Sequence, residues 1–180
     1  MTERSTTNRL FWAAALSVIV LDLITKELAV RYLSPPHIPH SILGDVVRFT
    51  LAYNPGAAFS MSVGDKSRYI FGAFAIIACV ILWRLYRASP PGDKARVLAL
   101  ALAWGGAAGN LIDRFRSRAS VVDFIDIGVG SVRFWTFNVA DSAVTIGAIL
   151  LALVLWREDA AADSESNAVP SPATADREVV

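Results

Sequence analysis

Apolar residues gather into four long runs that polar residues separate. The runs cover residues 10–33, 69–86, 96–112 and 138–156, and each is close to the roughly 20 residues that a helix needs to cross a hydrocarbon core. Lipid offers no hydrogen bonds to the backbone, so each run is expected to be helical. No A-x-A-like cleavage site follows the first run, which we therefore interpret as a retained helix. The pattern predicts an all-α membrane core, a four-transmembrane-helix bundle.

Two of the connecting segments have the composition of strands. Residues 45–54, "DVVRFTLAYN", and residues 120–137, "SVVDFIDIGVGSVRFWTF", are rich in β-branched and aromatic residues, and a glycine-rich turn interrupts the second. Two predicted spans, an even number, lie between these segments in the chain. Both segments are therefore expected on the same side of the membrane. We expect a small antiparallel β-sheet, a β-cradle, on one membrane surface.

The basic residues predict the orientation of the helices. Residues 84–96 hold four Lys and Arg side chains in 13 residues, against three in residues 34–68 and four in residues 113–137. The positive-inside rule then places the 84–96 turn and both termini in the cytoplasm. The predicted sheet is therefore extracytoplasmic.

The composition leaves little material for a separate soluble domain. Of 180 residues, 54% are hydrophobic, so we expect one integral membrane domain over residues 1–157. Residues 158–180 are polar, rich in Ala, Ser and Pro and without periodicity, which predicts a disordered cytoplasmic tail. The single cysteine, Cys79, can form neither a disulfide nor a cysteine-based metal site within the chain. His37 and His40 are interpreted as ordinary loop residues.

Two aspartates stand where a carboxylate is costly. Asp141 lies three residues after Asn138, which is a good helix N-cap, so its carboxylate falls in the first turn of the last helix. It could be a helix-start residue only. Asp123 alternates with apolar residues on one face of a predicted strand, and could be an exposed loop carboxylate. The hairpin that carries Asp123 leads directly into the helix of Asp141, so the chain can bring the two together. A carboxylate pair that shares one proton can act as general acid and general base.

The third run ends in a group of small and polar residues, "WGGAAGNLIDRFR". Residues 105–109, all glycine or alanine, predict a close approach between helices. Asn110 and Asp113 lie on one helical face, and Arg114 follows. Asn110 could bond a neighbouring helix and Arg114 could extend to lipid headgroups, or both could hold a peptide substrate. Asp22 and Lys26 have the i, i+4 spacing of an ion pair, and structural pairing is the preferred interpretation.

Five motifs in order, "DLITK", "YNPGAAFS", "GGAAGNLIDR", "VVDFIDI" and "FNVADSAVTIG", resemble those of lipoprotein signal peptidase, the bacterial signal peptidase II family. The resemblance covers about residues 10–156. It implies an intramembrane aspartyl endopeptidase, a hydrolase of lipoprotein processing that removes the signal peptide from diacylglyceryl-modified prolipoproteins before the lipidated cysteine. The implied catalytic residues are Asp123 and Asp141, the implied substrate-binding residues are Asn54, Asn110, Arg114 and Asn138, and the residues of structural support are Asp22, Lys26 and Asp113.

The resemblance also implies a location in the bacterial cytoplasmic (inner) membrane, and it bears on cofactors and partners. No cofactor and no metal are expected, and the partners are prolipoprotein substrates and membrane lipids, with no nucleic acid and a monomeric enzyme. Two alternatives remain from the residues alone. A small ion- or proton-coupled transporter could use the intramembrane carboxylates, and a metal-dependent phospholipid transferase could bind Mg²⁺ through Asp113, Asp123, Asp126 and Asp141.

Overall fold

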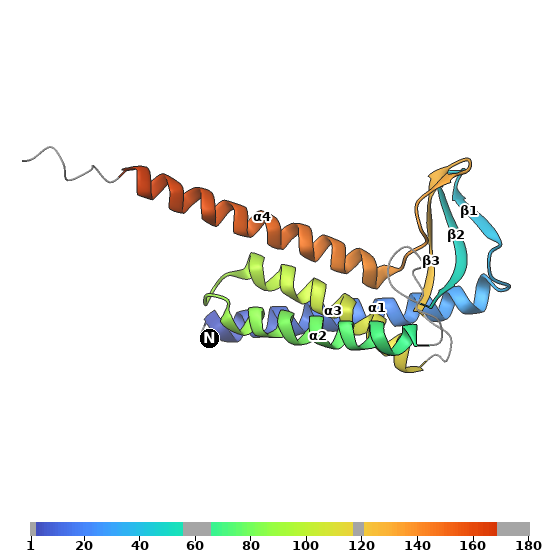
Figure 1. Cartoon of the computed structure of the whole chain (residues 1–180), viewed down its shortest axis with the longest axis horizontal. Coiled ribbons are helices and arrows are strands. Elements are labelled where there is room, and N and C mark those ends of the chain that lie inside the picture. Colours follow the sequence, from blue (N-terminus) through green and yellow to red (C-terminus); the bar gives the residue numbers. More distant parts are fainter. Residues whose placement is uncertain (1–2, 56–65, 117–120, 169–180) are drawn as a thin grey trace, which may run out of the picture.

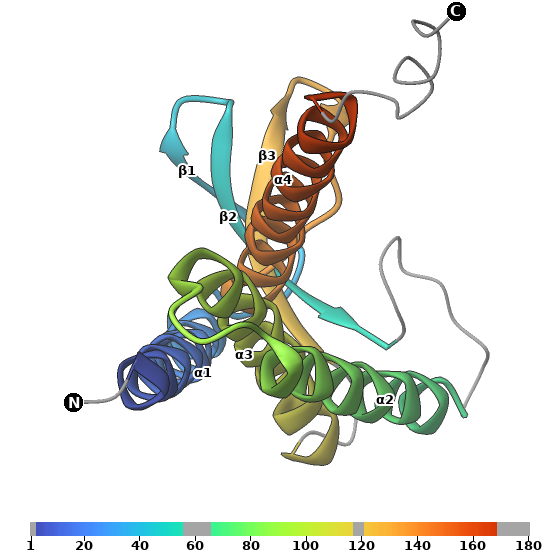
Figure 2. The ribbon, with the colours of Figure 1, turned by 90° about the vertical axis from the view of Figure 1, so that its left-hand side faces the viewer.

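The computed structural model describes residues 3–55, 66–116 and 121–168. Its helices are α1 (Glu3–Tyr32), α2 (Ser67–Ala88), α3 (Lys94–Arg116) and α4 (Val139–Ala168). They extend along the long axis of the molecule, and the sheet stands across one end of them (Figure 1). In the end view α3 lies between the other three helices (Figure 2). The predicted architecture, a four-helix bundle with a small sheet, is confirmed.

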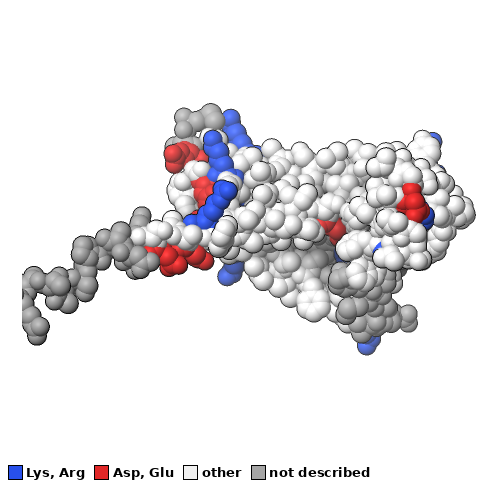
Figure 3. Space-filling view, turned by 90° about the horizontal axis from the view of Figure 1, so that it is seen from above, with Lys and Arg blue, Asp and Glu red and all other residues white. Residues whose placement is uncertain are grey.

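Three of the four helices are long and apolar enough to cross a membrane. These are Tyr69–Ala88 in α2, Lys94–Arg116 in α3 and Val139–Ser164 in α4. In the described part of the chain α1 is not among them, and it carries Asp22, Lys26 and Glu27 within six residues. A wide part of the molecular surface bears no charged side chain, and charges gather toward its two ends (Figure 3).

Small residues let α3 approach its neighbours, as the sequence predicted. A Cβ atom on Gly105 would lie 2.8 Å from the carbonyl oxygen of Ala15 in α1, and one on Gly106 would lie 2.3 Å from the carbonyl oxygen of Ala140 in α4. Such distances leave no room for a side chain, so the helices pack backbone to backbone here.

The sheet has four antiparallel strands in the order β1-β2-β3-β4. The strands are β1 (Pro39–Leu43), β2 (Val47–Asn54), β3 (Val121–Val129) and β4 (Val132–Arg133). The predicted strands contain β2, β3 and β4, whereas the sequence did not predict β1. That strand is exposed along its whole length and begins with a proline, which belongs at a sheet edge and weakens the strand signal.

The start of β3 is buried on both faces. The side chains from Val121 to Phe124 are all buried, since α1 and α3 contact the strand and Val122 and Phe124 join Ala29 and Leu51 in a small apolar cluster. Asp123 pairs with Ala52 of β2. The sheet therefore carries Asp123 into the junction between sheet and bundle.

The last helix is longer than the sequence predicted. We expected the helical run to end at Trp156 and residues 158–180 to be disordered, but α4 continues to Ala168. Residues 157–163 are rich in Arg, Glu and Ala, which are good helix formers, and Glu158 forms an ion pair with Arg96 of α3. Residues 169–180 lie outside the described residues.

Candidate active site

A reciprocal cap begins α4. The Asn138 side-chain oxygen accepts a hydrogen bond from the Asp141 backbone N–H at 2.9 Å, and Asp141 Oδ2 accepts one from the Asn138 backbone N–H at 3.3 Å. This is the geometry of a capping box, with aspartate in the place of the usual glutamate. The predicted cap is confirmed. It fixes the Asp141 carboxylate at the positive end of the helix dipole.

Asp123 approaches the same place from the sheet. Its side chain is buried, with 2% exposed, and accepts hydrogen bonds from Asn138 Nδ2 at 2.7 Å and from Asn54 Nδ2 at 3.1 Å. Asn138 therefore contacts both aspartates, one through its side-chain amide and the other through its backbone and its amide oxygen. The interpretation of Asp123 as an exposed loop residue is wrong.

Asn110 connects α3 to the same site. Its side-chain Nδ2 donates to Asp141 Oδ1 at 2.7 Å, and its Oδ1 accepts from Asn138 Nδ2 at 3.2 Å. Each of the two Asp141 oxygens thus accepts one hydrogen bond, Oδ1 from a side chain and Oδ2 from the backbone. Polar groups from two helices and the sheet define the position of both carboxylates.

A buried charged group supports this arrangement. Lys26 is 3% exposed and its Nζ lies 2.7 Å from Asp22, 2.9 Å from Asp113 and 2.9 Å from Asn110 Oδ1. Because the ammonium group can only donate, it orients Asn110 with its oxygen toward Lys26 and its Nδ2 toward Asp141. The predicted Asp22–Lys26 pair is confirmed, and Asp113 is a second partner.

The same acidic side chains also hold the backbone around the site. Asp22 Oδ1 accepts a hydrogen bond from Ala140 N–H at 2.9 Å, in the first turn of α4. Asp113 Oδ2 accepts one from Val122 N–H at 3.3 Å, next to Asp123. These two backbone contacts were not predicted, because sequence patterns carry no signal for a backbone group that binds a distant side chain.

Arg114 and Asn54 complete the set of predicted residues. Arg114 donates to the backbone oxygen of Asn110 at 2.9 Å, and its half-buried guanidinium interacts electrostatically with Asp141 and Asp123. Asn54 is the last residue of β2 and binds Asp123. The remainder of its motif, residues 56–60, lies outside the described residues.

The electrostatics differ between the two carboxyl groups. Burial in the first place, and then the charge of the nearby Asp141, raise the pKa of Asp123 from 3.8 to about 7, although hydrogen bonds from Asn54 and Asn138 act in the opposite direction. Asp123 is therefore partly protonated at neutral pH. Asp141, in the first turn of α4, occupies a position that favours an anion.

The other aspartates are held elsewhere. Asp126 accepts hydrogen bonds from Arg133 at 2.8 Å and Thr50 at 3.0 Å, on the sheet, and Asp113 binds Lys26. Within the described ranges no three His, Cys, Asp or Glu side chains gather as a metal site. Asp126 and Asp113 thus bind cationic side chains of their own, so the described structure does not gather the four aspartates of the transferase alternative into one site.

Two carboxyl groups that one asparagine holds together, at the end of a membrane helix bundle, are the arrangement that a membrane aspartic peptidase uses. A sequence model described as Signal peptidase (SPase) II matches residues 14–157. The chain belongs to the signal peptidase II family.

Individual relatives agree with this assignment. The chain is 45% identical over 149 residues to a lipoprotein signal peptidase of Mycolicibacterium smegmatis, covering 79% of this chain and 59% of that protein. It is 35% identical over 145 residues to the one of Francisella tularensis subsp. novicida, covering 78% and 88%. A solved bacterial membrane enzyme matches with a TM-score of 0.74 and 28% identity, over 89% of this chain and 92% of the other.

Proposed function

We propose that Asp123 and Asp141 are the catalytic pair of an intramembrane endopeptidase. The observation that carries the proposal is the Asn138 bridge, which binds the Asp123 carboxyl through its amide at 2.7 Å and caps the helix of Asp141 at 2.9 Å. One side chain thereby fixes both acids. The nine predicted site residues gather at one junction of bundle and sheet, which supports the proposal of a monomeric enzyme.

In the proposed reaction the ionised Asp141 accepts a proton from water, whose oxygen forms a bond to the scissile carbonyl carbon. Protonated Asp123 transfers its proton to the carbonyl oxygen as negative charge develops there, which gives a tetrahedral diol. As the diol collapses, the C–N bond breaks and the leaving nitrogen takes the proton that Asp141 had accepted. One diol hydroxyl returns its proton to Asp123, and a carboxylic acid and an amine result.

The raised pKa of Asp123 supports this division of roles. A carboxyl group with a pKa of about 7 retains its proton at a pH where an ordinary aspartate has lost it. Asp141 lies in the helix turn that favours an anion. The sequence left open which aspartate is the acid, and the raised pKa of Asp123 supports assigning that role to it.

The proposed substrate is a prolipoprotein that carries a diacylglyceryl group, cut before the lipidated cysteine. Its acyl chains would stay in the hydrocarbon while the peptide bond reaches the junction of bundle and sheet. Lipid anchoring then restricts the substrate to one depth, which favours reaction by proximity. The proposed contacts to the peptide are Asn54, Asn110 and Arg114. Each of them interacts with an aspartate of the pair and is only partly buried.

The proposed orientation places the sheet and the site outside the cytoplasm and both termini inside. The basic turn between α2 and α3 supports it through the positive-inside rule, and α1 would cross the membrane with its charges neutralised by pairing. Single cysteines introduced at Lys94 and at Ser131, in a Cys79→Ala background, test this. A membrane-impermeant thiol reagent should label the Ser131 site in intact cells and the Lys94 site only after lysis.

The catalytic proposal is tested with a purified diacylglyceryl-modified prolipoprotein and EDTA in the reaction. Wild type should cut before the lipidated cysteine, and Asp123→Asn and Asp141→Asn should be folded and inactive. Asp126→Asn is the matched control, because Asp126 lies on the same strand as Asp123 but binds Arg133 instead of the site. Near-full activity in either site variant would overturn the two-carboxylate mechanism.

A further inference from the structure

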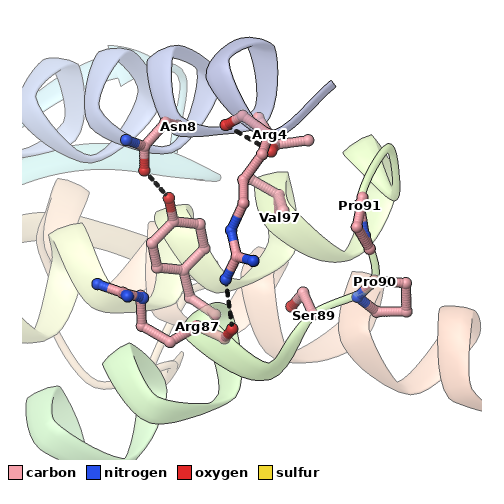
Figure 4. Close-up of a pocket in the computed structure, with 9 residues that line it drawn as sticks. Arg4, Asn8, Arg87, Ser89, Pro90, Pro91 and Val97 are labelled. Carbon is pink, nitrogen blue, oxygen red and sulfur yellow. Dashed lines mark hydrogen bonds between the residues drawn. The ribbon is translucent and has the colours of Figure 1, made fainter. Parts of the chain in front are cut away.

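A cavity of about 200 Å³ lies at the end of the bundle remote from the sheet. It is formed by the first turns of α1, the last turn of α2 and the turn that leads into α3 (Figure 4). This volume is several times the roughly 30 Å³ that one water molecule occupies in the liquid, so the cavity has room for a small polar group. The cavity lies away from both aspartates, and the proposed catalysis makes no use of it.

The charge of the cavity is positive. Its lining contains two arginines, Arg4 and Arg87, and no acidic side chain. Arg4 extends from α1 toward the end of α2, with its Nη2 3.5 Å from the Arg87 backbone oxygen (Figure 4). The Arg87 guanidinium turns away from Arg4 and lies 5.9 Å from the centre of the Trp83 ring, so it marks the edge of the cavity. Guanidinium groups bind phosphate oxygens, so a cavity edged by two arginines from different helices is a suitable site for a phosphate group.

The acidic side chains near this end of the bundle do not pair with the two arginines of the cavity in the described structure. Asp93 and Glu158 both bind Arg96, outside the cavity. Glu3 lies against Gly92, with its Oε2 3.1 Å from the position of a Cβ there. Glu3 therefore lies beside the turn that borders the cavity, and it is not among the lining residues.

Tryptophans place the cavity at the depth of lipid headgroups. Trp12 lies two turns after Arg4 on α1, and Trp83 lies one turn before Arg87 on α2, with the two rings 5.5 Å apart. Trp12 is 38% exposed. Exposed tryptophan marks the boundary between hydrocarbon and headgroups. The arginines lie beyond it toward the helix ends, where lipid phosphates are found.

We propose that this cavity binds the phosphate of an anionic phospholipid in the leaflet opposite the sheet. Basic pockets between membrane helices are suited to anionic headgroups. The open side of the cavity, where Arg4, Asn8 and Arg87 are exposed, admits a headgroup. The buried Tyr86, whose hydroxyl donates to Asn8, forms part of the inner wall.

Native mass spectrometry of the full chain, incubated with an equimolar mixture of phosphatidylglycerol and phosphatidylcholine, tests the proposal. Wild type should retain phosphatidylglycerol preferentially. Loss of each arginine should weaken retention by about fivefold, so that Arg4→Gln has an intermediate effect and Arg4→Gln/Arg87→Gln removes the preference. Arg84→Gln is the matched control, because Arg84 is an exposed arginine one turn away on α2 that does not line the cavity.

Three results would overturn the proposal. Wild type could retain both lipids equally. Arg84→Gln could lose as much as Arg4→Gln, which would mean diffuse attraction to a basic surface. Millimolar inorganic phosphate could displace the lipid from the wild type, which would mean that a free anion is the ligand. The thermal unfolding midpoint of each variant without lipid shows that it is folded, and Arg4→Gln alone, an exposed change in the first turn of α1, suffices if the double variant does not fold.

Discussion

The side-chain amide of Asn138 donates to the carboxyl group of Asp123 at 2.7 Å, although the two residues belong to different elements, one to the start of α4 and the other to β3. The same asparagine caps α4 through its amide oxygen. The cap and the bridge are therefore two functions of one side chain, and substitutions can separate them.

Asn138→Ala should lose both functions. Loss of the cap and an unsatisfied buried carboxyl group should lower the free energy of unfolding by about 3 kcal/mol, and activity should fall on the order of 100-fold. Asn138→Ser keeps a capping oxygen but no amide. It should recover about 1 kcal/mol of stability relative to alanine without recovering activity. Equal stability of the serine and alanine variants, by thermal unfolding in detergent, would contradict the cap.

Activity should decline as pH rises through about 7. The pKa of Asp123 is raised to about 7. In the proposed mechanism Asp123 acts as the acid in its protonated form, so kcat/KM should be highest below that value and fall tenfold per pH unit well above it. The measurement is kcat/KM against pH with a prolipoprotein substrate. An alkaline limit set far above pH 7 would show that Asp123 is not the acid.

The raised pKa of Asp123 should also make the free energy of unfolding decrease as pH rises. Between pH 3.8, the ordinary pKa of aspartate, and pH of about 7, the folded protein retains the proton of Asp123 and the unfolded chain releases it. This contribution is complete below 3.8 and is lost as pH rises through about 7. Between pH values below 3.8 and pH values above 7, the wild type should lose on the order of 4 kcal/mol of unfolding free energy relative to Asp123→Asn. Parallel stability curves for the two proteins would contradict it.

Lys26→Met should be strongly destabilising. The ammonium group lies between Asp22 and Asp113, both buried, so its removal leaves two buried carboxylates without a cation. The expected loss is about 3 to 5 kcal/mol of unfolding free energy. Lys94→Met, at an exposed position, should change it by less than about 0.5 kcal/mol. Adding Asp113→Asn to Lys26→Met should recover part of the loss, because only one carboxylate then remains.

Gly106→Ala should separate α3 from α4. The new methyl group would lie 2.3 Å from the Ala140 carbonyl oxygen, and overpacking of this kind costs about 1 to 3 kcal/mol. Activity should fall too, since Asn110 of α3 binds Asp141 of α4 one turn away. Gly72→Ala is the control, because a Cβ there meets nothing within 4 Å. Equal effects of the two substitutions on activity and thermal unfolding would show that the close approach is unimportant.

The sequence predicts the periodic and local features of this molecule well. Long apolar runs, the Asn138 cap and the Asp22–Lys26 pair all depend on residues close together in the chain. The bundle and most of the sheet follow from them. Small residues at positions 105–109 correctly indicated close helix contact, although a pattern of this kind does not specify which helices meet.

Features that depend on distant partners could not be predicted from a single sequence. Asp113 binds Val122 N–H and Asp22 binds Ala140 N–H, contacts in which one side is a backbone group without a sequence signature. The exposed edge strand β1 lacks a buried face and therefore lacks alternation. The end of α4 was placed too early because residues 157–168 are polar all round, yet they are good helix formers beside an ion pair with α3.

The hydrogen bond from Ala140 to Asp22 spans 118 residues. During synthesis Asp22 is made early, and its final partner is made only when the last helix begins. Lys26, one turn away on the same helix, neutralises Asp22 throughout that interval, since the pair forms within α1 alone. The proposed catalytic pair is consequently completed late in synthesis, because no fragment that ends before residue 141 contains both Asp123 and Asp141.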